Sequence, residues 1–121
     1  MRTRILYVDD EADIREVAVL ALELEPAFEV RACSSGEEAV AAAPAWKPAL
    51  ILLDVMMPFM DGPATLARLR ELPELASTPV VFITARTQAA ERERLLALGA
   101  AGVIAKPFDP MTLADSVRAH L

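Results

Sequence analysis

Five short apolar runs alternate along the chain with longer segments that have a helical pattern. The runs are Ile5–Val8, Phe28–Ala32, Leu50–Leu53, Val80–Ile83 and Val103–Ala105. Three of them are nearly continuous in leucine or β-branched residues, which is typical of strands covered on both faces in a parallel sheet. The run at 28–32 alternates between apolar and charged residues instead, which favours an edge strand with one wetter face.

The segments between the runs carry helix start and stop signals. Ser35-Gly36-Glu37-Glu38 predicts a capping box, in which Ser35 and Glu38 satisfy exposed backbone amides reciprocally. Asp109-Pro110 predicts a cap followed by proline at the first position of the last helix. Gly99 is expected to end a helix over residues 92–98. Residues 11–24 are expected to form one apolar stripe, made of Ile14, Val17, Ala18, Ala21 and Leu24.

The order of the elements is therefore strand and helix, repeated five times. Because crossover helices with right-handed connections cover both faces of a parallel sheet, this pattern predicts a three-layer α/β sandwich. We see no internal repeat beyond this alternation, no low-complexity segment and no linker. The 121 residues are expected to form one domain, residues 1–121.

Composition narrows the class of protein. A net charge of −6 argues against direct nucleic-acid binding, which normally needs a basic patch. Cys33 is the only cysteine, which excludes an internal disulfide and a zinc site built from several cysteines. No segment resembles a signal peptide, and no apolar run approaches the length of a membrane span. These features favour a soluble protein of the cytoplasm with no membrane partner.

Polar side chains gather where the predicted strands end. The first strand is followed by Asp9-Asp10-Glu11, the third by Asp54, the fourth by Thr84 and the fifth by Lys106-Pro107. In open parallel α/β sheets, function collects beyond the carboxyl ends of the strands. The sequence therefore predicts one shallow site that contains three aspartates, a hydroxyl and an ammonium group.

Three aspartates in one site repel one another. At about 4 Å, a pair of like charges costs roughly 1 kcal/mol in water and about 4 kcal/mol at an effective dielectric constant of about 20. The aspartates contribute −3 and Lys106 contributes +1, so a divalent cation brings the formal sum to zero. Carboxylate oxygens with water and a backbone carbonyl suit Mg²⁺, whereas zinc is disfavoured because the site has no histidine or cysteine.

Four motifs at the ends of four predicted strands resemble the receiver domain of two-component signalling, and the resemblance spans essentially the whole chain. The motifs are Val8-Asp9-Asp10-Glu11, Leu53-Asp54-Val55-Met56-Met57-Pro58 with Asp61-Gly62, Thr84-Ala85, and Lys106-Pro107-Phe108. The resemblance implies a flavodoxin-like fold with strand order 2-1-3-4-5. It also implies a phosphoprotein that acts as a response regulator in phosphorelay signal transduction.

In this family the third strand carries the phosphoacceptor, and the resemblance gives that role to Asp54 here. The resemblance implies that Asp54 attacks the phosphorus of a phosphohistidine or of a small phosphodonor. Asp10 would bind Mg²⁺ (or Mn²⁺) directly, and Asp9 would act mainly through water bound to the metal. Asp54 and the backbone carbonyl of Met56 would complete the protein ligands.

The same resemblance gives roles to the remaining site residues. Lys106 would pair with one phosphoryl oxygen, and Thr84 would donate its hydroxyl to another; the Lys106-Pro107 bond is expected to be cis. The phosphoryl source would be a sensor histidine kinase or a histidine phosphotransfer protein, docked near Ile14. The output would be protein–protein contact with an unidentified target, and no enzyme activity is expected beyond self-phosphorylation and slow autodephosphorylation.

Val103 departs from the family pattern. Receivers usually carry Tyr or Phe three residues before the lysine, and that ring swings inward as the threonine moves to the phosphoryl group. Valine has no ring to relocate, so we expect rearrangement of the loop at 85–90 or a muted response. Met56 and Arg86 occupy positions that flank the path of the attacking water, and they are expected to tune the lifetime of the phosphoryl group.

The sequence leaves three other functions open. A hydrolase of the haloacid-dehalogenase type also uses an aspartyl-phosphate, but its motif after the first strand is Asp-x-Asp rather than Asp9-Asp10. A flavin-binding module shares the topology, yet Asp9, Asp10 and Glu11 would repel its phosphate. A pseudo-receiver would bind a partner without phosphorylation, and Val103 is the feature that favours it.

Overall fold

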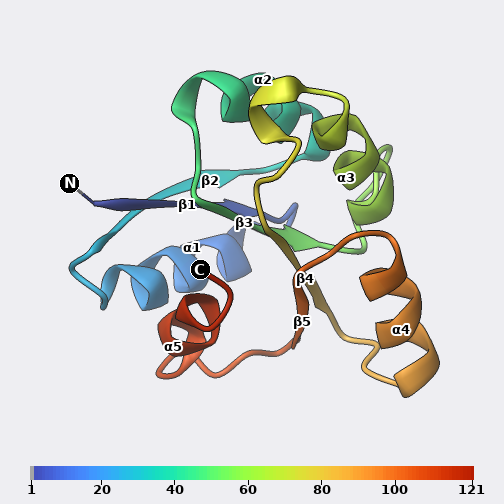
Figure 1. Ribbon diagram of the computed structural model, residues 1–121. Helices are drawn as coiled ribbons and strands as arrows, with labels where there is room; N and C mark the ends of the chain where they lie inside the picture. Colours follow the sequence, from blue (N-terminus) through green and yellow to red (C-terminus); the bar gives the residue numbers. More distant parts are fainter. Residues whose placement is uncertain (1) are drawn as a thin grey trace.

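The computed structural model, which describes residues 2–121, has a five-stranded parallel sheet between two layers of helices (Figure 1). The strands are β1 (Thr3–Val8), β2 (Phe28–Cys33), β3 (Leu50–Asp54), β4 (Val80–Thr84) and β5 (Gly102–Ala105). The helices are α1 (Ala12–Glu23), α2 (Gly36–Trp46), α3 (Gly62–Arg70), the 3₁₀ helix η1 (Pro73–Leu75), α4 (Ala89–Ala97) and α5 (Leu113–Arg118). The predicted strands are confirmed, each with one or two additional residues.

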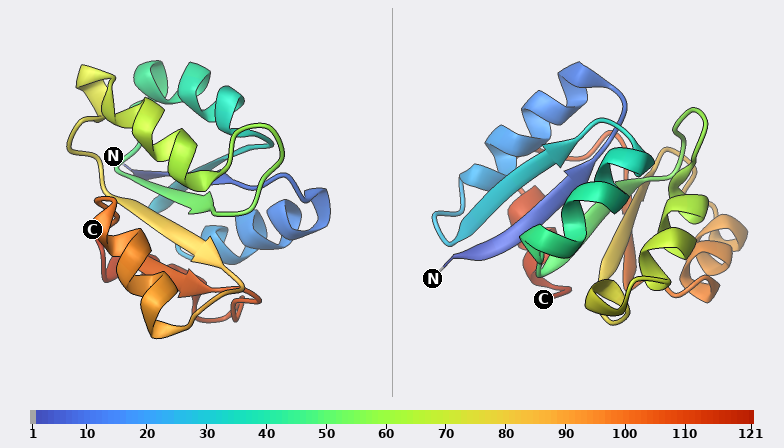
Figure 2. Two further views of the ribbon diagram at one scale, coloured as in Figure 1. Left: turned by 90° about the vertical axis from the view of Figure 1, so that its right-hand side faces the viewer. Right: turned by 90° about the horizontal axis from the view of Figure 1, so that it is seen from above.

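The strand order β2-β1-β3-β4-β5 confirms the order that the resemblance implies. Figure 2 shows the strands running in one direction, so all their carboxyl ends meet at one edge. Every residue of β3 and β4 is buried, as expected of strands covered on both faces. Strand β2 lies at an edge as predicted, and its four interior residues are all at least partly exposed.

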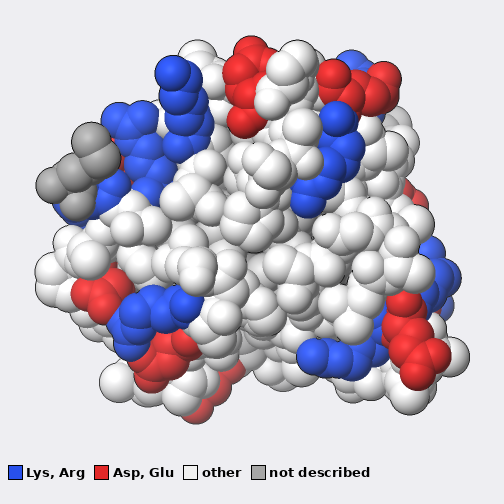
Figure 3. All heavy atoms as spheres, viewed as in Figure 1, with Lys and Arg blue, Asp and Glu red and all other residues white. Residues whose placement is uncertain are grey.

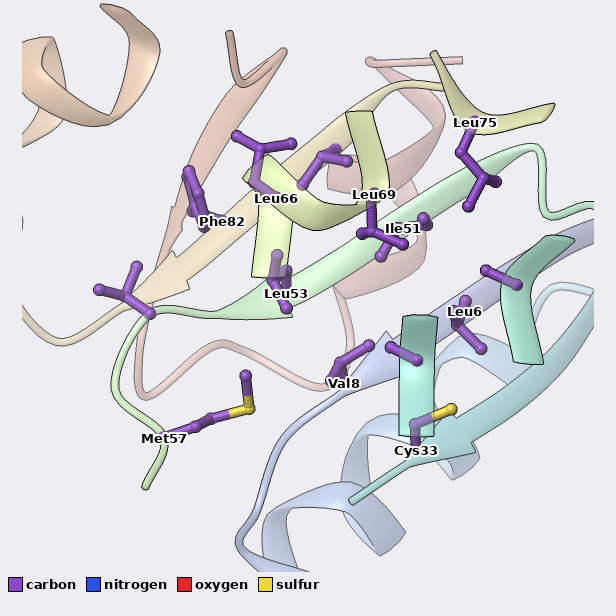
Figure 4. Packing of buried hydrophobic residues seen from close by; sticks show 14 of the residues in the cluster. Leu6, Val8, Cys33, Ile51, Leu53, Met57, Leu66, Leu69, Leu75 and Phe82 are labelled. Atoms are coloured by element: carbon purple, nitrogen blue, oxygen red, sulfur yellow. The ribbon is translucent and has the colours of Figure 1, made fainter. Parts of the chain in front are cut away.

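The helices cover the sheet in two layers, with α1 and α5 on one face and α2, α3 and α4 on the other. The α1 and α5 side is packed by Ile5, Tyr7, Ala18, Ala21, Leu22, Leu52, Leu113 and Val117, among others. Figure 4 shows the opposite cluster, in which the labelled residues include Leu6, Val8, Cys33, Ile51, Leu53, Leu66, Leu69 and Phe82. The two clusters hold the sheet rigid and thereby fix the positions of its strand ends.

The apolar stripe of α1 differs from the prediction. Ala18 and Ala21 are buried together with Leu22, which was not predicted. Val17 is 45% exposed and Leu24 is 61% exposed, so these two residues of the predicted stripe lie at the surface rather than against the sheet. The face of α1 that meets the sheet is narrower than the apolar stripe, because small alanines bring the helix close to the strands. The rest of the stripe is left at the surface.

The predicted caps are confirmed in part. The Ser35 hydroxyl accepts a hydrogen bond from Glu38 N at 3.0 Å, but the Glu38 carboxylate bonds to N and Oγ of Ser34 rather than closing the box on Ser35. Gly99, with φ of 105°, follows α4 as expected. The start of α5 at residue 110 was wrong. Asp109 accepts from Met111 N at 2.9 Å in a separate turn, and the helix begins three residues after Pro110.

Charged side chains are distributed without one dominant sign on the face drawn in Figure 3. Acidic and basic groups lie around its rim, and uncharged atoms cover its centre. This face therefore offers no continuous basic surface of the kind that holds a nucleic-acid backbone. None of the helices within residues 2–121 has the length and apolar character needed to cross a membrane.

Candidate functional site

Four of the predicted site residues lie at the carboxyl edge of the sheet. Asp9 follows β1, Asp54 ends β3, Thr84 ends β4 and Lys106 follows β5. The parallel register pairs Thr84 with Ala105 and Asp54 with Ile83, which aligns these strand ends. The sheet thus brings together residues that are up to 97 positions apart in the chain.

Lys106 is the centre of this group. Its Nζ donates to Asp9 Oδ2 at 3.1 Å, to Glu11 Oε1 at 3.0 Å and to Asp54 Oδ2 at 3.3 Å. The side chains of Asp9 and Asp54 are 0% and 4% exposed, and that of Lys106 is 13% exposed. The Lys106-Pro107 bond is cis, as expected. All three ammonium protons are therefore directed at carboxylates, two of which are buried.

Groups other than Lys106 also donate hydrogen bonds to Asp9. Tyr7 donates its hydroxyl to Asp9 Oδ2 at 2.9 Å, and the Glu11 amide donates to Asp9 Oδ1 at 3.0 Å. The Arg15 guanidinium donates to the Asp9 carbonyl at 2.9 Å. Sequence reasoning missed the contribution of Tyr7. The spacing offered a signal, because residues i and i+2 of a strand share one face of the sheet.

The Asp54 carboxylate is costly to ionise. Burial raises the pKa of Asp54 to about 6, repulsion by Asp9 adds to the rise, and attraction by Lys106 opposes it. Burial alone would lower the pKa of Lys106, but the hydrogen bonds to Glu11 and Asp9 and the charge of Asp54 outweigh it and raise that pKa. Three carboxylates and one ammonium group leave an excess of two negative charges in a largely buried site.

The donor atoms fit a hard divalent cation. One carboxylate oxygen from each of Asp9, Glu11 and Asp54 lies within 4.8 Å of the other two, and oxygen ligands of this kind suit Mg²⁺. The structure brings Asp9 and Asp54 together as predicted, and it adds Glu11, which was not predicted to be a metal ligand. Asp10 is exposed and is not part of this group of three. Its role as a ligand, like that of the Met56 carbonyl, stays a prediction.

A pocket of about 550 Å³ opens beside the acidic group. Asp54, Glu11 and Lys106 border it on one side. The remaining lining is mostly apolar and consists of Ile14, Val17, Met56, Ala85, Pro107 and Phe108, together with Asp13. Ile14 and Val17 of the α1 stripe thus face the same hollow as the predicted acceptor.

Thr84 and Val103 lie on neighbouring strands. Thr84 is 2% exposed, and its Oγ1 accepts from Arg86 N at 3.0 Å, which leaves the hydroxyl proton for another acceptor. Val103 is 7% exposed, and its carbonyl accepts from the Arg92 guanidinium at 3.3 Å. The position expected to hold an aromatic ring is therefore filled by a small buried side chain.

Comparison with known proteins agrees with this geometry. The model of the response regulator receiver domain matches residues 5–118. The chain is 40% identical over 117 residues to the transcriptional regulatory protein YvrH of Bacillus subtilis, covering 97% of this chain and 48% of YvrH. It is 39% identical over 121 residues to the transcriptional regulatory protein SrrA of Staphylococcus aureus, covering 100% and 48%.

Solved structures give the same result. The chemotaxis protein CheY4 of Vibrio cholerae has a TM-score of 0.92 at 30% identity, with full coverage of both chains. The signal receiver domain of a histidine kinase from Syntrophus aciditrophicus has a TM-score of 0.83 at 34% identity, covering 98% of this chain and 89% of that one. The chain spans about half the length of the curated relatives named above. It belongs to the response regulator receiver domain family of two-component signalling.

Proposed function

We propose that this receiver accepts a phosphoryl group on Asp54 from the phosphohistidine of a sensor histidine kinase or a histidine phosphotransfer protein. The observation that carries the proposal is the Lys106 ammonium group, bonded to Asp9, Glu11 and Asp54 at the carboxyl edge of the sheet. This arrangement supplies a buried carboxylate, a cationic partner and an acidic site for a metal, which phosphoryl transfer requires.

In the proposed step, a carboxylate oxygen of Asp54 forms a bond to phosphorus as the P–N bond of the donor breaks. The imidazole nitrogen leaves with the electron pair of that bond and is protonated. Lys106 turns from Asp54 to one phosphoryl oxygen, and Thr84 donates its hydroxyl to another. Little covalent chemistry is needed, because positioning and charge neutralisation account for most of the rate in such transfers.

Mg²⁺ or Mn²⁺ would be held by Asp9, Asp10, Asp54 and the carbonyl of Met56. When bound, the cation neutralises charge on the carboxylates and on the transferred group. The three carboxylates around Lys106 leave an excess of two negative charges, which supports this proposal because one divalent cation would neutralise it. The oxygens of Asp9 and Asp54 already lie within 4.8 Å of each other. The Glu11 side chain is exposed, so water can replace Lys106 as its hydrogen-bond partner when Lys106 moves to the phosphoryl group.

The apolar wall of the pocket supports a protein donor. Ile14 and Val17 of α1 face the hollow that Asp54 and Phe108 also border. A donor helix could cover these side chains while its histidine approaches Asp54. The proposed output is protein–protein contact, in the cytoplasm, with a target that is not identified. Water attacking the same phosphorus would return the receiver slowly to its starting state.

A small phosphodonor tests the proposal without a kinase. The protein is incubated with acetyl phosphate and Mg²⁺, and its intact mass is measured. We expect one added phosphoryl group in the wild type, none in Asp54→Asn and none when Mg²⁺ is chelated. A wild type that gains no phosphoryl group would contradict the proposal and favour a pseudo-receiver. An equal gain in Asp54→Asn would show that another residue is the acceptor.

A further inference from the structure

Tyr7 bonds directly to the acidic site from within the core. Its hydroxyl donates to Asp9 Oδ2 at 2.9 Å, and both residues are fully buried. We propose that Tyr7 is a positioning residue, which fixes the Asp9 carboxylate for metal binding and keeps it fixed when Lys106 moves to the phosphoryl group. This inference rests on the proposed function, because it assigns a role within the same site.

The tyrosine ring has little freedom to move. Tyr7 lies in β1, where it pairs with Ala32 of β2 on one side and with Leu52 of β3 on the other. Its ring is packed in the cluster between the sheet and helices α1 and α5. The packed ring therefore keeps the phenol hydroxyl aimed at one carboxylate oxygen of Asp9.

Few hydrogen-bond donors hold the Asp9 carboxylate once Lys106 has moved to the phosphoryl group. Its Oδ1 is held by the Glu11 amide, and its Oδ2 is shared by Tyr7 and Lys106. When Lys106 pairs with a phosphoryl oxygen, Tyr7 is the side-chain donor that remains on Oδ2. Outer groups that orient metal ligands in this way are worth about 10–100-fold in metal affinity. Loss of the hydroxyl should therefore weaken metal binding more than it weakens the fold.

Tyr7→Phe removes the hydroxyl and keeps the ring. Mg²⁺ dissociation constants are measured by titration calorimetry for the wild type, Tyr7→Phe and the matched control Ile5→Val, which alters the same face of the same strand. We expect about 10-fold weaker binding in Tyr7→Phe and unchanged binding in Ile5→Val. The rate of phosphorylation by acetyl phosphate in Tyr7→Phe should recover at high Mg²⁺. An unchanged dissociation constant in Tyr7→Phe would overturn the inference, as would equal weakening in both variants.

A second measurement reads the hydrogen bond itself. Tyr7 is the only tyrosine of the chain, so protein labelled with ¹³C at the tyrosine ζ carbon gives a single resonance. We expect this resonance to shift with Mg²⁺ at the concentrations that saturate the calorimetric titration. A resonance that does not move while Mg²⁺ binds would overturn the role of Tyr7 alone. A wild type that binds no Mg²⁺ would overturn the proposed function together with this inference.

Discussion

Burial of Asp54 beside Asp9 makes its ionisation costly, and the cost can be measured as stability. The pKa of Asp54 rises from its ordinary value of 3.8 to about 6, and at about 1.4 kcal/mol per pH unit this rise corresponds to about 3 kcal/mol. The side chain is 4% exposed, so solvent screening reduces this value little. Asp54→Asn keeps the size of the side chain and an oxygen that Lys106 can still contact.

The direction in which stability changes with pH follows from proton binding to Asp54 in the folded and unfolded states. Between pH 3.8 and about 6 the folded protein holds the Asp54 proton more tightly than the unfolded chain, so stability falls as pH rises through this range. Above about pH 6 the full cost is present in the folded state. Asp54→Asn removes that cost. In the absence of metal, the variant should be about as stable as the wild type at about pH 4 and about 3 kcal/mol more stable at about pH 8.

Urea unfolding, followed by the fluorescence of the single Trp46, measures the difference in EDTA across this pH range. Glu23→Gln, which removes one exposed carboxylate far from the site, is the control for net charge. Added Mg²⁺ should reduce the advantage of Asp54→Asn, because the cation offsets the charge of the wild-type carboxylate. A variant that is no more stable at high pH, or whose advantage shrinks as pH rises, would refute the reasoning.

Three further predictions concern the loops around the site. Phe59→Gly should raise the free energy of unfolding in urea by about 0.5–1 kcal/mol. Phe59 is fully exposed with φ of 68°, and a residue in this left-handed conformation is strained unless it is glycine. A less stable variant would contradict this. Gly62→Ala should cost about 1–3 kcal/mol, since its Cβ would lie 2.6 Å from the Asp54 carbonyl oxygen. It should also slow phosphorylation by acetyl phosphate, and a variant unchanged in both respects would count against the close approach. Replacing Met56 and Arg86 together by Asn should change the rate of phosphoryl loss several-fold, and an unaltered decay rate would argue against their role beside the path of water.

The sequence predicts the sheet well because its signals are strong. Continuous apolar runs such as Leu50–Leu53 and Val80–Ile83 leave few alternatives to central parallel strands. Helix ends are harder to predict, because local hydrogen bonds compete for the same side chains. Asp109 illustrates this, since it closes a turn at Met111 instead of capping the last helix.

The types of the site residues and the meeting of three of them were predictable from the sequence, but not every contact in the site was. The ends of parallel strands place Asp9, Asp54 and Lys106 at one edge, so their meeting follows from topology. The contribution of Glu11 does not follow, because it depends on the side-chain conformation chosen after the strand ends. The contact of Tyr7 was predictable in part. Its position two residues before Asp9 was visible, but only packing shows that its hydroxyl reaches the carboxylate.

The central claim is that Asp54 carries the phosphoryl group, and chemical trapping tests it most directly. Borohydride reduces an acyl phosphate to an alcohol, which converts a phosphorylated aspartate into homoserine. The protein is treated with acetyl phosphate and Mg²⁺, reduced, digested and analysed by peptide mass spectrometry. We expect homoserine at position 54 and intact aspartates at positions 9 and 10. Homoserine at Asp9 or Asp10, or at no aspartate of the chain, would contradict it.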